Sequence, residues 1–296
     1  MLRTLAFFDL FDHPLTLYEL YAWWCRTEWC SWGAFRGMAD ALEHEGRIRV
    51  IDGMVMVSDR AELADTRRMR SASIAQKMKR AVRAARLLRW VPFVEMVAVC
   101  NRLSVGHPHE TSDIDVFIVI RDGRLWFGRL LVTAMLQLAG LRRHGDQIAN
   151  RVCLSFYLTP RAAALDRIAL ADRDDIYLRY WVAHLLPLWA RKRSLDDFWQ
   201  ANQWAHRTFH QVPQPLPFAG KRAPAFAILF AWLFGGWIGD AFERASRALQ
   251  VRHMGASAAR HNSAVVISDT MLKFHENDRR EWYATQWRER ARALGI

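Results

Sequence analysis

The chain has 296 residues, which is enough for one to three domains with cores of their own. Apolar residues make up 52% and charged residues 24%, a balance that excludes a disordered or fibrous chain. The 42 Lys and Arg residues exceed the 30 Asp and Glu residues, and the net charge of +12 suggests a polyanionic partner such as nucleic acid, nucleotide phosphate or an anionic membrane surface. Four scattered cysteines and an N-terminus without a signal-peptide pattern predict a cytoplasmic protein.

The N-terminal segment reads as three short helices followed by a β-hairpin, which is the element order of a winged helix. Thr16 and Glu19 have the spacing of a capping box at the start of the second helix. Asp52-Gly53 between two apolar stretches predicts a type I′ turn. We therefore predict a winged-helix-like domain over residues 1–60.

The charge of this first domain differs from that of the rest of the chain. Residues 1–59 hold five Arg against nine Asp and Glu, a net charge of −4, which leaves +16 for the remaining residues. The third predicted helix offers Arg36 against Asp40, Glu43 and Glu45, although contacts to phosphates supply most DNA affinity. This argues against sequence-specific DNA binding and favours a packing or protein-interaction domain.

A basic helix follows the first domain and connects it to the next. Residues 66–89 contain nine Arg and Lys and no acidic residue, and we predict a connecting helix over 61–90. An apolar stripe at helical spacing comprises Ile74, Met78, Val82, Ala85 and Leu88. The favoured interpretation is that this stripe docks on the core beneath a solvated charged face. The alternative is a surface that binds the phosphates of nucleic acid or lipid.

The most informative stretch lies between residues 94 and 120, where two apolar strands flank a polar turn. The second strand begins with Asp113 and Asp115, and this alternation directs both carboxylates to one face. Two carboxylates at the end of an apolar strand are costly unless a cation neutralises them, and oxygen ligands favour Mg²⁺ or Mn²⁺. Arg102 and Ser104 in the turn add donors for a phosphate group.

The run Ser112-Asp113-Ile114-Asp115 and the apolar strand after it resemble the signature of the polymerase-β-like nucleotidyltransferases. The ten residues between Arg102 and Asp113 fit that signature, and the whole layout looks like that of predicted bacterial nucleotidyltransferases with an N-terminal winged helix. The resemblance implies a small mixed-sheet core over residues 91–170. It also implies Mg²⁺-dependent transfer of a nucleoside monophosphate from an NTP to an acceptor hydroxyl on a protein, a nucleic acid or a small molecule. Carried over residue by residue, it assigns catalysis and metal binding to Asp113 and Asp115, and nucleotide binding to Asn101, Arg102, Ser104, Gly106 and Ser112.

The sequence departs from this family's pattern at two places. Asn101-Arg102 stand where the family has Gly-Ser, and the strand expected at 151–158 carries no third carboxylate. The alternative function is therefore a catalytically degenerate, nucleotide-binding regulator or scaffold. A purely structural alternative is that the two aspartates cap a strand end.

Two arginines near the start of the next predicted helix are further candidates. Arg124 and Arg129 precede and begin a helix expected over residues 125–141, and they are either phosphate clamps or solvated charges.

The remainder, residues 171–296, is predicted to be helical. One helix is expected through Tyr177, Trp181, Leu185 and Leu188. Residues 223–239 are uncharged but too short and too rich in Gly for a convincing membrane span. A buried helix is the favoured interpretation of this segment, and peripheral membrane contact is the alternative. A proline-containing linker at 213–217 and a small-residue loop at 255–263 complete the region. The overall expectation is a mixed α+β protein with more helix than strand.

Overall fold

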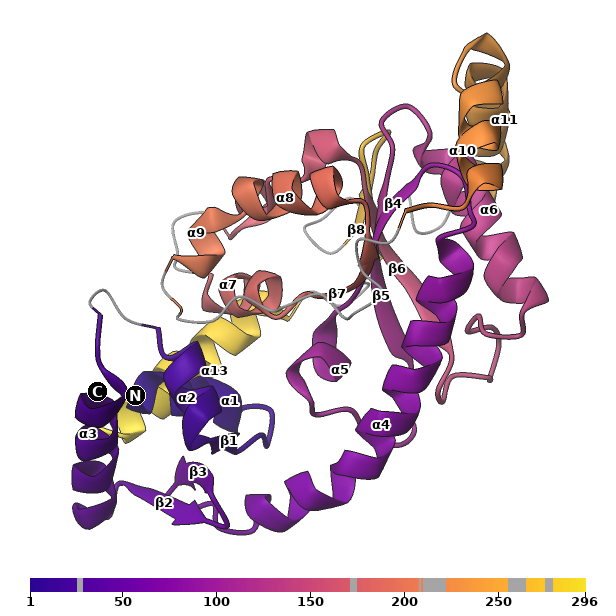
Figure 1. Ribbon diagram of the computed structural model, residues 1–296. Helices are drawn as coiled ribbons and strands as arrows, with labels where there is room; N and C mark the ends of the chain where they lie inside the picture. Colours follow the sequence, from indigo (N-terminus) through magenta and orange to yellow (C-terminus); the bar gives the residue numbers. More distant parts are fainter. Residues whose placement is uncertain (26–28, 171–174, 208, 210–221, 255–264, 275–278) are drawn as a thin grey trace.

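The computed structural model describes the chain except for residues 26–28, 171–174, 208, 210–221, 255–264 and 275–278 (Figure 1). The protein is a mixed α/β protein with open sheets, 54% helical and 17% strand, in agreement with the expected class. The linker predicted at 213–217 and the loop predicted at 255–263 lie outside the described residues.

Residues 1–60, called the N-terminal module below, form helices around a small antiparallel sheet of order β1-β3-β2. Its elements are α1 (Leu2–Asp9), β1 (Leu15–Thr16), α2 (Leu17–Trp23), α3 (Trp32–His44), β2 (Ile48–Ile51) and β3 (Met54–Val57). The capping box is confirmed, because Glu19 N donates to Thr16 Oγ1 and Thr16 N donates to the Glu19 carboxylate. Asp52 and Gly53 both have positive φ, as a type I′ turn requires.

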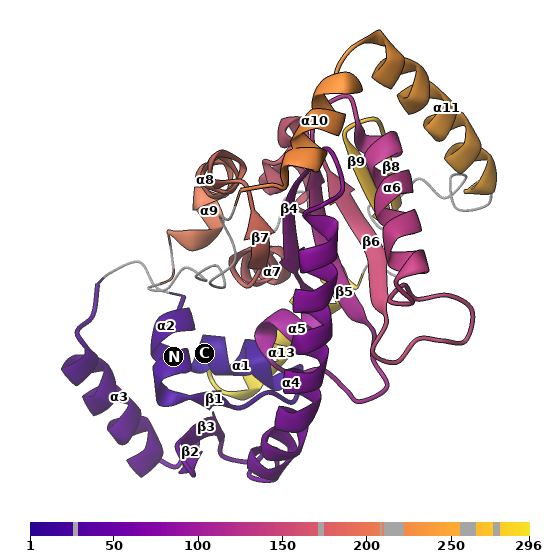
Figure 2. The same ribbon diagram turned by 45° about the vertical axis from the view of Figure 1, so that its right-hand side comes forward.

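A six-stranded sheet of order β7-β4-β5-β6-β9-β8 forms the centre of the molecule (Figures 1 and 2). Its strands are β4 (Val94–Val99), β5 (Ile114–Ile120), β6 (Val152–Leu158), β7 (Leu186–Ala190), β8 (Val265–Ile267) and β9 (Met271–Phe274). Strands β5 and β6 run parallel, and all other neighbours in this sheet are antiparallel.

The prediction of an entirely helical region over 171–296 is wrong, because β7, β8 and β9 come from it. The helix expected through Leu185 and Leu188 ends at Ala183, and the chain continues as the edge strand β7. Four of the five residues of β7 are buried, so the strand shows no alternation of apolar and polar residues that would distinguish it from a buried helix.

Helices cover both faces of the large sheet. The helices outside the N-terminal module are α4 (Leu63–Leu88), α5 (Asn101–Val105), α6 (Leu125–Leu138), α7 (Ile176–Ala183), α8 (Lys192–Ala201), α9 (Gln203–His206), α10 (Ala225–Leu233), α11 (Trp237–His253) and α13 (Arg280–Ala293), with 3₁₀ turns η1 (Pro160–Ala162) and η2 (Leu165–Ile168). Side chains of α4 and α6 form one core with the sheet, and side chains of α7 and α8 form a second core on the other face.

The apolar stripe of helix α4 docks on the core, as the sequence analysis predicted. Ala85 and Leu88 are buried, and Ile74, Met78 and Val82 pack partly buried against the same core. Many of its basic side chains contact other parts of the chain rather than standing free in solvent. Arg67 forms an ion pair with Glu19, and Arg68 forms ion pairs with Asp52 and Asp65. Arg70 and Arg80 donate hydrogen bonds to the backbone carbonyls of Asp12 and Asn150. Lys77 is fully buried.

The N-terminal module shares its core with late parts of the chain. Phe7 stacks on Tyr180 of α7 at 4.2 Å between ring centroids. Helix α13 lies against α1, and Arg290 pairs with Asp9 and Asp59. The N and C labels of Figure 1 accordingly lie close together.

The interpretation of residues 223–239 as a buried helix is wrong. The helix is interrupted between α10 and α11, whose axes differ in direction by 90°. Most large apolar side chains of α10 are exposed. We call α10, the break and α11 the apolar hairpin. Among the described residues no single helix is long and apolar enough to cross a membrane, although this bent pair meets the criterion when its two helices are taken together.

Candidate active site

The turn between β4 and β5 contains the short helix α5, and two left-handed residues bound it. Asn101, at its start, has φ +55°, and Gly106, just after its end, has φ +88°. Asn adopts this region more readily than other residues with a side chain, so it can replace glycine there. The backbone at position 101 is therefore one that both glycine and asparagine tolerate.

The two carboxylates converge with a thiol from the next strand. Asp115 lies opposite Cys153 in the parallel register of β5 and β6. One potential ligand atom each from Asp113, Asp115 and Cys153 lies within 4.8 Å of the other two. The three residues therefore form one possible metal-binding group, in which Cys153 stands on the strand where a third carboxylate was expected.

The electrostatics of this group favour a bound cation. Burial and the neighbouring Asp113 charge raise the pKa of Asp115 to about 6. Burial, followed by the charges of Asp115 and Asp113, raises the pKa of Cys153 to about 12. The thiol is therefore neutral at physiological pH, and the two carboxylates are the charged ligands that this group offers.

Hydrogen bonds from neighbouring side chains orient the two carboxylates. The Asn101 side chain hydrogen-bonds Asp115, and its Oδ1 accepts a 2.6 Å hydrogen bond from Trp181 Nε1. Arg143, in the segment between α6 and β6, donates a 2.7 Å hydrogen bond from Nη1 to Asp113 Oδ2. Asp113 thus has a cationic partner that a metal ion would compete with.

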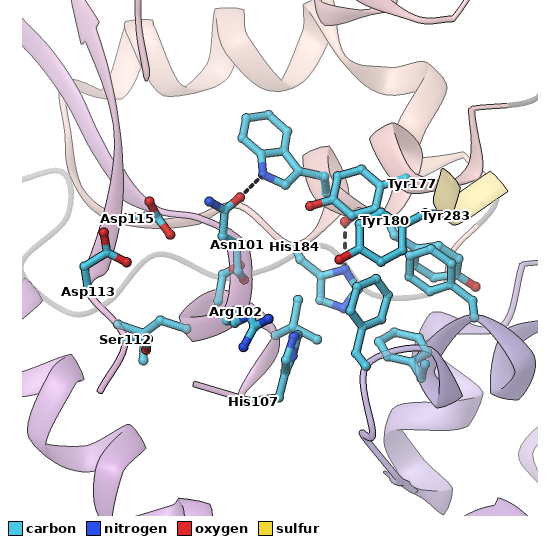
Figure 3. Close-up of a pocket in the computed structure, with 17 residues that line it drawn as sticks. Asn101, Arg102, His107, Ser112, Asp113, Asp115, Tyr177, Tyr180, His184 and Tyr283 are labelled. Carbon is cyan, nitrogen blue, oxygen red and sulfur yellow. Dashed lines mark hydrogen bonds between the residues drawn. The ribbon is translucent and has the colours of Figure 1, made fainter. Parts of the chain in front are cut away.

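A cavity of about 320 Å³ opens beside the carboxylates and reaches the N-terminal module (Figure 3). Asp113, Asp115 and Ser112 lie at one end of it, and Arg102 lies between them and the aromatic residues. The aromatic wall includes Phe7, Phe11, Tyr177, Tyr180, Trp181 and Tyr283. The cavity is therefore bounded by three parts of the chain: the N-terminal module, the sheet with α5, and the helices α7 and α13.

The structure brings most of the residues proposed for nucleotide binding to this cavity. Asn101, Arg102, Ser104 and Ser112 line it, whereas Gly106 is not a lining residue and instead ends α5. Ser104 Oγ donates to Asn101 O and Ser112 Oγ donates to His109 O, so both hydroxyls hold the local backbone. Arg102 is the cationic side chain that faces the cavity.

The sequence analysis missed Lys77, which fixes the segment leading to the carboxylates. This fully buried α4 residue donates to Ser112 O at 2.6 Å and to Glu110 O and Asn150 Oδ1 at 3.0 Å. The missed signal is its helical register, because Ser73, Lys77 and Ala81 share the buried face of α4. Arg143 and Cys153 left no comparable signal, because each reaches the site through its place in the tertiary structure.

Neither interpretation of Arg124 and Arg129 holds, because both side chains contact the apolar hairpin. Arg124 donates to the backbone carbonyls of Phe234, Gly235 and Gly236, which form the break in the hairpin, and it pairs with Asp240. Arg129 donates to Gln250 of α11.

Three histidines are buried where the N-terminal module meets the core. His13 and His107 lie 5.4 Å apart between ring centroids, and His184 stacks on Trp23 at 3.7 Å. Burial lowers the pKa of all three, and that of His184 falls to about 4. Neutral imidazoles are therefore part of this junction at physiological pH.

No protein-family model and no curated protein matches the chain. The chemistry of the cavity is therefore the ground on which a function can be assigned.

Proposed function

We propose that the protein is a Mg²⁺-dependent nucleotidyltransferase that moves a nucleoside monophosphate from an NTP to an acceptor hydroxyl. The observation that carries the proposal is the convergence of two carboxylates, Asp113 just before β5 and Asp115 within it, at the end of a cavity. The order of β4, α5 and β5, with this pair at the start of β5, supports the resemblance to polymerase-β-like nucleotidyltransferases.

Each group in the cavity then has a role in this chemistry. Asp113 and Asp115 would hold Mg²⁺, which neutralises phosphate charge when bound. Arg102 faces the same space and offers a planar guanidinium to a phosphate group. In the transfer, the acceptor hydroxyl gives up its proton to solvent and its oxygen forms a bond to the α-phosphorus. The bond from that phosphorus to the bridging oxygen breaks, and pyrophosphate leaves. The aromatic wall offers ring faces on which a nucleobase can stack.

A second function is supported by one specific observation. Cys153, a neutral thiol, lies opposite Asp115 on β6, and this strand carries no Asp or Glu to serve as the family's third carboxylate. Without that carboxylate, a nucleotide could bind with no group to activate the acceptor. The second candidate is therefore a catalytically degenerate nucleotide-binding regulator or scaffold.

Calorimetric titration with each of the four NTPs, with and without Mg²⁺, tests both candidates. The wild-type protein should bind an NTP in the presence of Mg²⁺, and Asp113→Asn and Asp115→Asn should weaken that binding at least about tenfold. Asp146→Asn, at an exposed loop carboxylate outside the cavity, is the matched control and should bind as the wild type does.

Release of pyrophosphate separates the two candidates. Mg²⁺-dependent release that both aspartate variants abolish supports the transferase. Mg²⁺-dependent binding without release supports the regulator. Equal binding by all four proteins, or no binding by any of them, overturns both candidates and leaves the aspartates as a strand cap.

A further inference from the structure

The apolar hairpin displays large hydrophobic side chains to solvent. Trp232 at the end of α10 is 75% exposed and Trp237 at the start of α11 is 78% exposed. Phe226, Leu229, Leu233 and Phe242 are each between 46% and 60% exposed on the same two helices. Several large apolar side chains exposed on neighbouring helices indicate a binding site for another apolar surface.

The protein holds this patch in a defined bent conformation. The Arg124 guanidinium, which is nearly fully buried, donates to three carbonyls at the break between the helices. Gly239 packs so closely there that an added Cβ would lie 1.9 Å from Phe234 O and 2.8 Å from the Arg124 guanidinium. The bend is thus built into the fold, and the exposed face follows from it.

The two acidic residues of the hairpin are paired with groups at the start of α6. Asp240, whose side chain is 53% exposed, pairs with Arg124, and the Glu243 carboxylate accepts hydrogen bonds from the amides of Trp126 and Phe127. Arg244 and Arg252 of α11 are exposed, as is Arg222 just before α10. The outer surface of the hairpin therefore combines apolar side chains with positive charge.

We propose that this surface docks the protein on a lipid bilayer with anionic headgroups. Tryptophan prefers the boundary between headgroups and acyl chains, and arginines attract anionic lipids. Helix α10 has nine residues, about half the length needed to span a bilayer, so the hairpin would lie in the interface. The inference does not depend on the proposed nucleotide chemistry.

The position of the hairpin is compatible with such docking. In both ribbon views α10 and α11 lie at one end of the molecule, and the N-terminal module lies at the other (Figures 1 and 2). A bilayer on the hairpin would therefore leave the N-terminal module in the aqueous phase.

Co-sedimentation of the full chain with vesicles tests the proposal. The wild type should bind vesicles of phosphatidylcholine mixed with phosphatidylglycerol more tightly than vesicles of phosphatidylcholine alone. Raising NaCl from about 0.05 M to about 0.5 M should weaken binding to the anionic vesicles. The double variant Trp232→Ser/Trp237→Ser should bind the anionic vesicles at least about tenfold more weakly.

The matched control is Trp29→Ser, because Trp29 in the N-terminal module is also 78% exposed. It should bind as the wild type does, and circular dichroism should show that all variants are folded. A further variant, Arg244→Gln/Arg252→Gln, should weaken binding to anionic vesicles and leave binding to phosphatidylcholine unchanged.

Three results would overturn the proposal. The first is no binding of the folded wild type to either kind of vesicle. The second is equal loss in the Trp29 control and the hairpin variant. The third is a wild-type dimer that dissociates in the hairpin variant and binds no vesicles, which would assign the face to a second copy of the chain.

Discussion

Asp115 and Cys153 lie opposite each other on parallel strands, with a carboxylate and a thiol within 4.8 Å. A carboxylate at position 153 would convert the group into three oxygen donors. We expect Cys153→Asp to bind Mg²⁺ about tenfold more tightly than the wild type, since affinity for hard cations rises with the number of charged oxygen ligands. Calorimetry with Mg²⁺ measures the change. Cys153→Ser, which adds no charge, is the control and should show no such gain.

Arg143 is expected to compete with a cation for Asp113. Their 2.7 Å ion pair is partly exposed, and such pairs contribute about 1 kcal/mol or less. Arg143→Ala should therefore raise Mg²⁺ affinity by about two- to fivefold, whereas Arg142→Ala, at the neighbouring position, should change it little. An unchanged or weaker affinity in Arg143→Ala would show that the guanidinium does not oppose the metal.

Asn101 allows a direct test of the backbone requirement at the site. A backbone φ of +55° is strained for residues other than Gly, Asn and Asp. Asn101→Ala should therefore be less stable than Asn101→Gly by about 1 kcal/mol. Both variants lose the contacts with Trp181 and Asp115, so the difference between them isolates the backbone term. Urea unfolding measures both, and equal stability of the two would argue against strain at this residue.

Lys77 should contribute strongly to stability and to the position of the carboxylates. Lys77→Met keeps most of the side-chain volume but leaves three partly buried acceptors without their donor, at a cost of about 2–4 kcal/mol. The control is Lys79→Met at an exposed position on the same helix, where a change within about 0.5 kcal/mol is expected. Comparable losses in the two variants would contradict a specific role for Lys77.

The buried histidines predict that acid destabilises the junction between the N-terminal module and the core. The pKa of His184 is about 4 in the folded protein and about 6.5 in the unfolded chain, so the unfolded chain binds the proton more readily between these values. The contribution of neutral His184 to the free energy of unfolding is fully present above about pH 6.5 and falls as the pH decreases. Near pH 4 this contribution has decreased by about 3 kcal/mol.

Urea unfolding at a series of pH values measures this loss. His184→Phe keeps a ring to stack on Trp23 and cannot titrate, so its stability should fall less steeply below about pH 6.5. His13 and His107 remain and act in the same direction, because burial lowers the pKa of both. Parallel pH profiles for variant and wild type would exclude His184 as a source of the acid sensitivity.

Local rules predicted the local features of this chain well. The capping box of Thr16 and Glu19, the turn at Asp52-Gly53 and the placement of Asp113 and Asp115 at the start of β5 each depend on residues close in sequence. The mixed α/β class followed from the same kind of signal.

Features that depend on tertiary contacts were not predictable in the same way. Strand β7 is almost entirely buried and has no periodicity of its own, so a helix was expected there. Cys153 and Arg143 reach the carboxylates through the pairing of β6 with β5 and through the segment before β6. The apolar hairpin was expected to be buried because hydrophobicity alone does not show whether another part of the chain covers a helix.

The place of α13 in the chain has a consequence for protein synthesis. Tyr283 forms part of the cavity wall, and Arg280 makes a 3.1 Å buried ion pair with Asp175. A nascent chain on the ribosome therefore presents both carboxylates well before the residues that close the cavity around them have been added. A product truncated before residue 280 would retain β5 but would lack Tyr283 from the wall of the cavity, so the cavity is complete only after α13 has been synthesised.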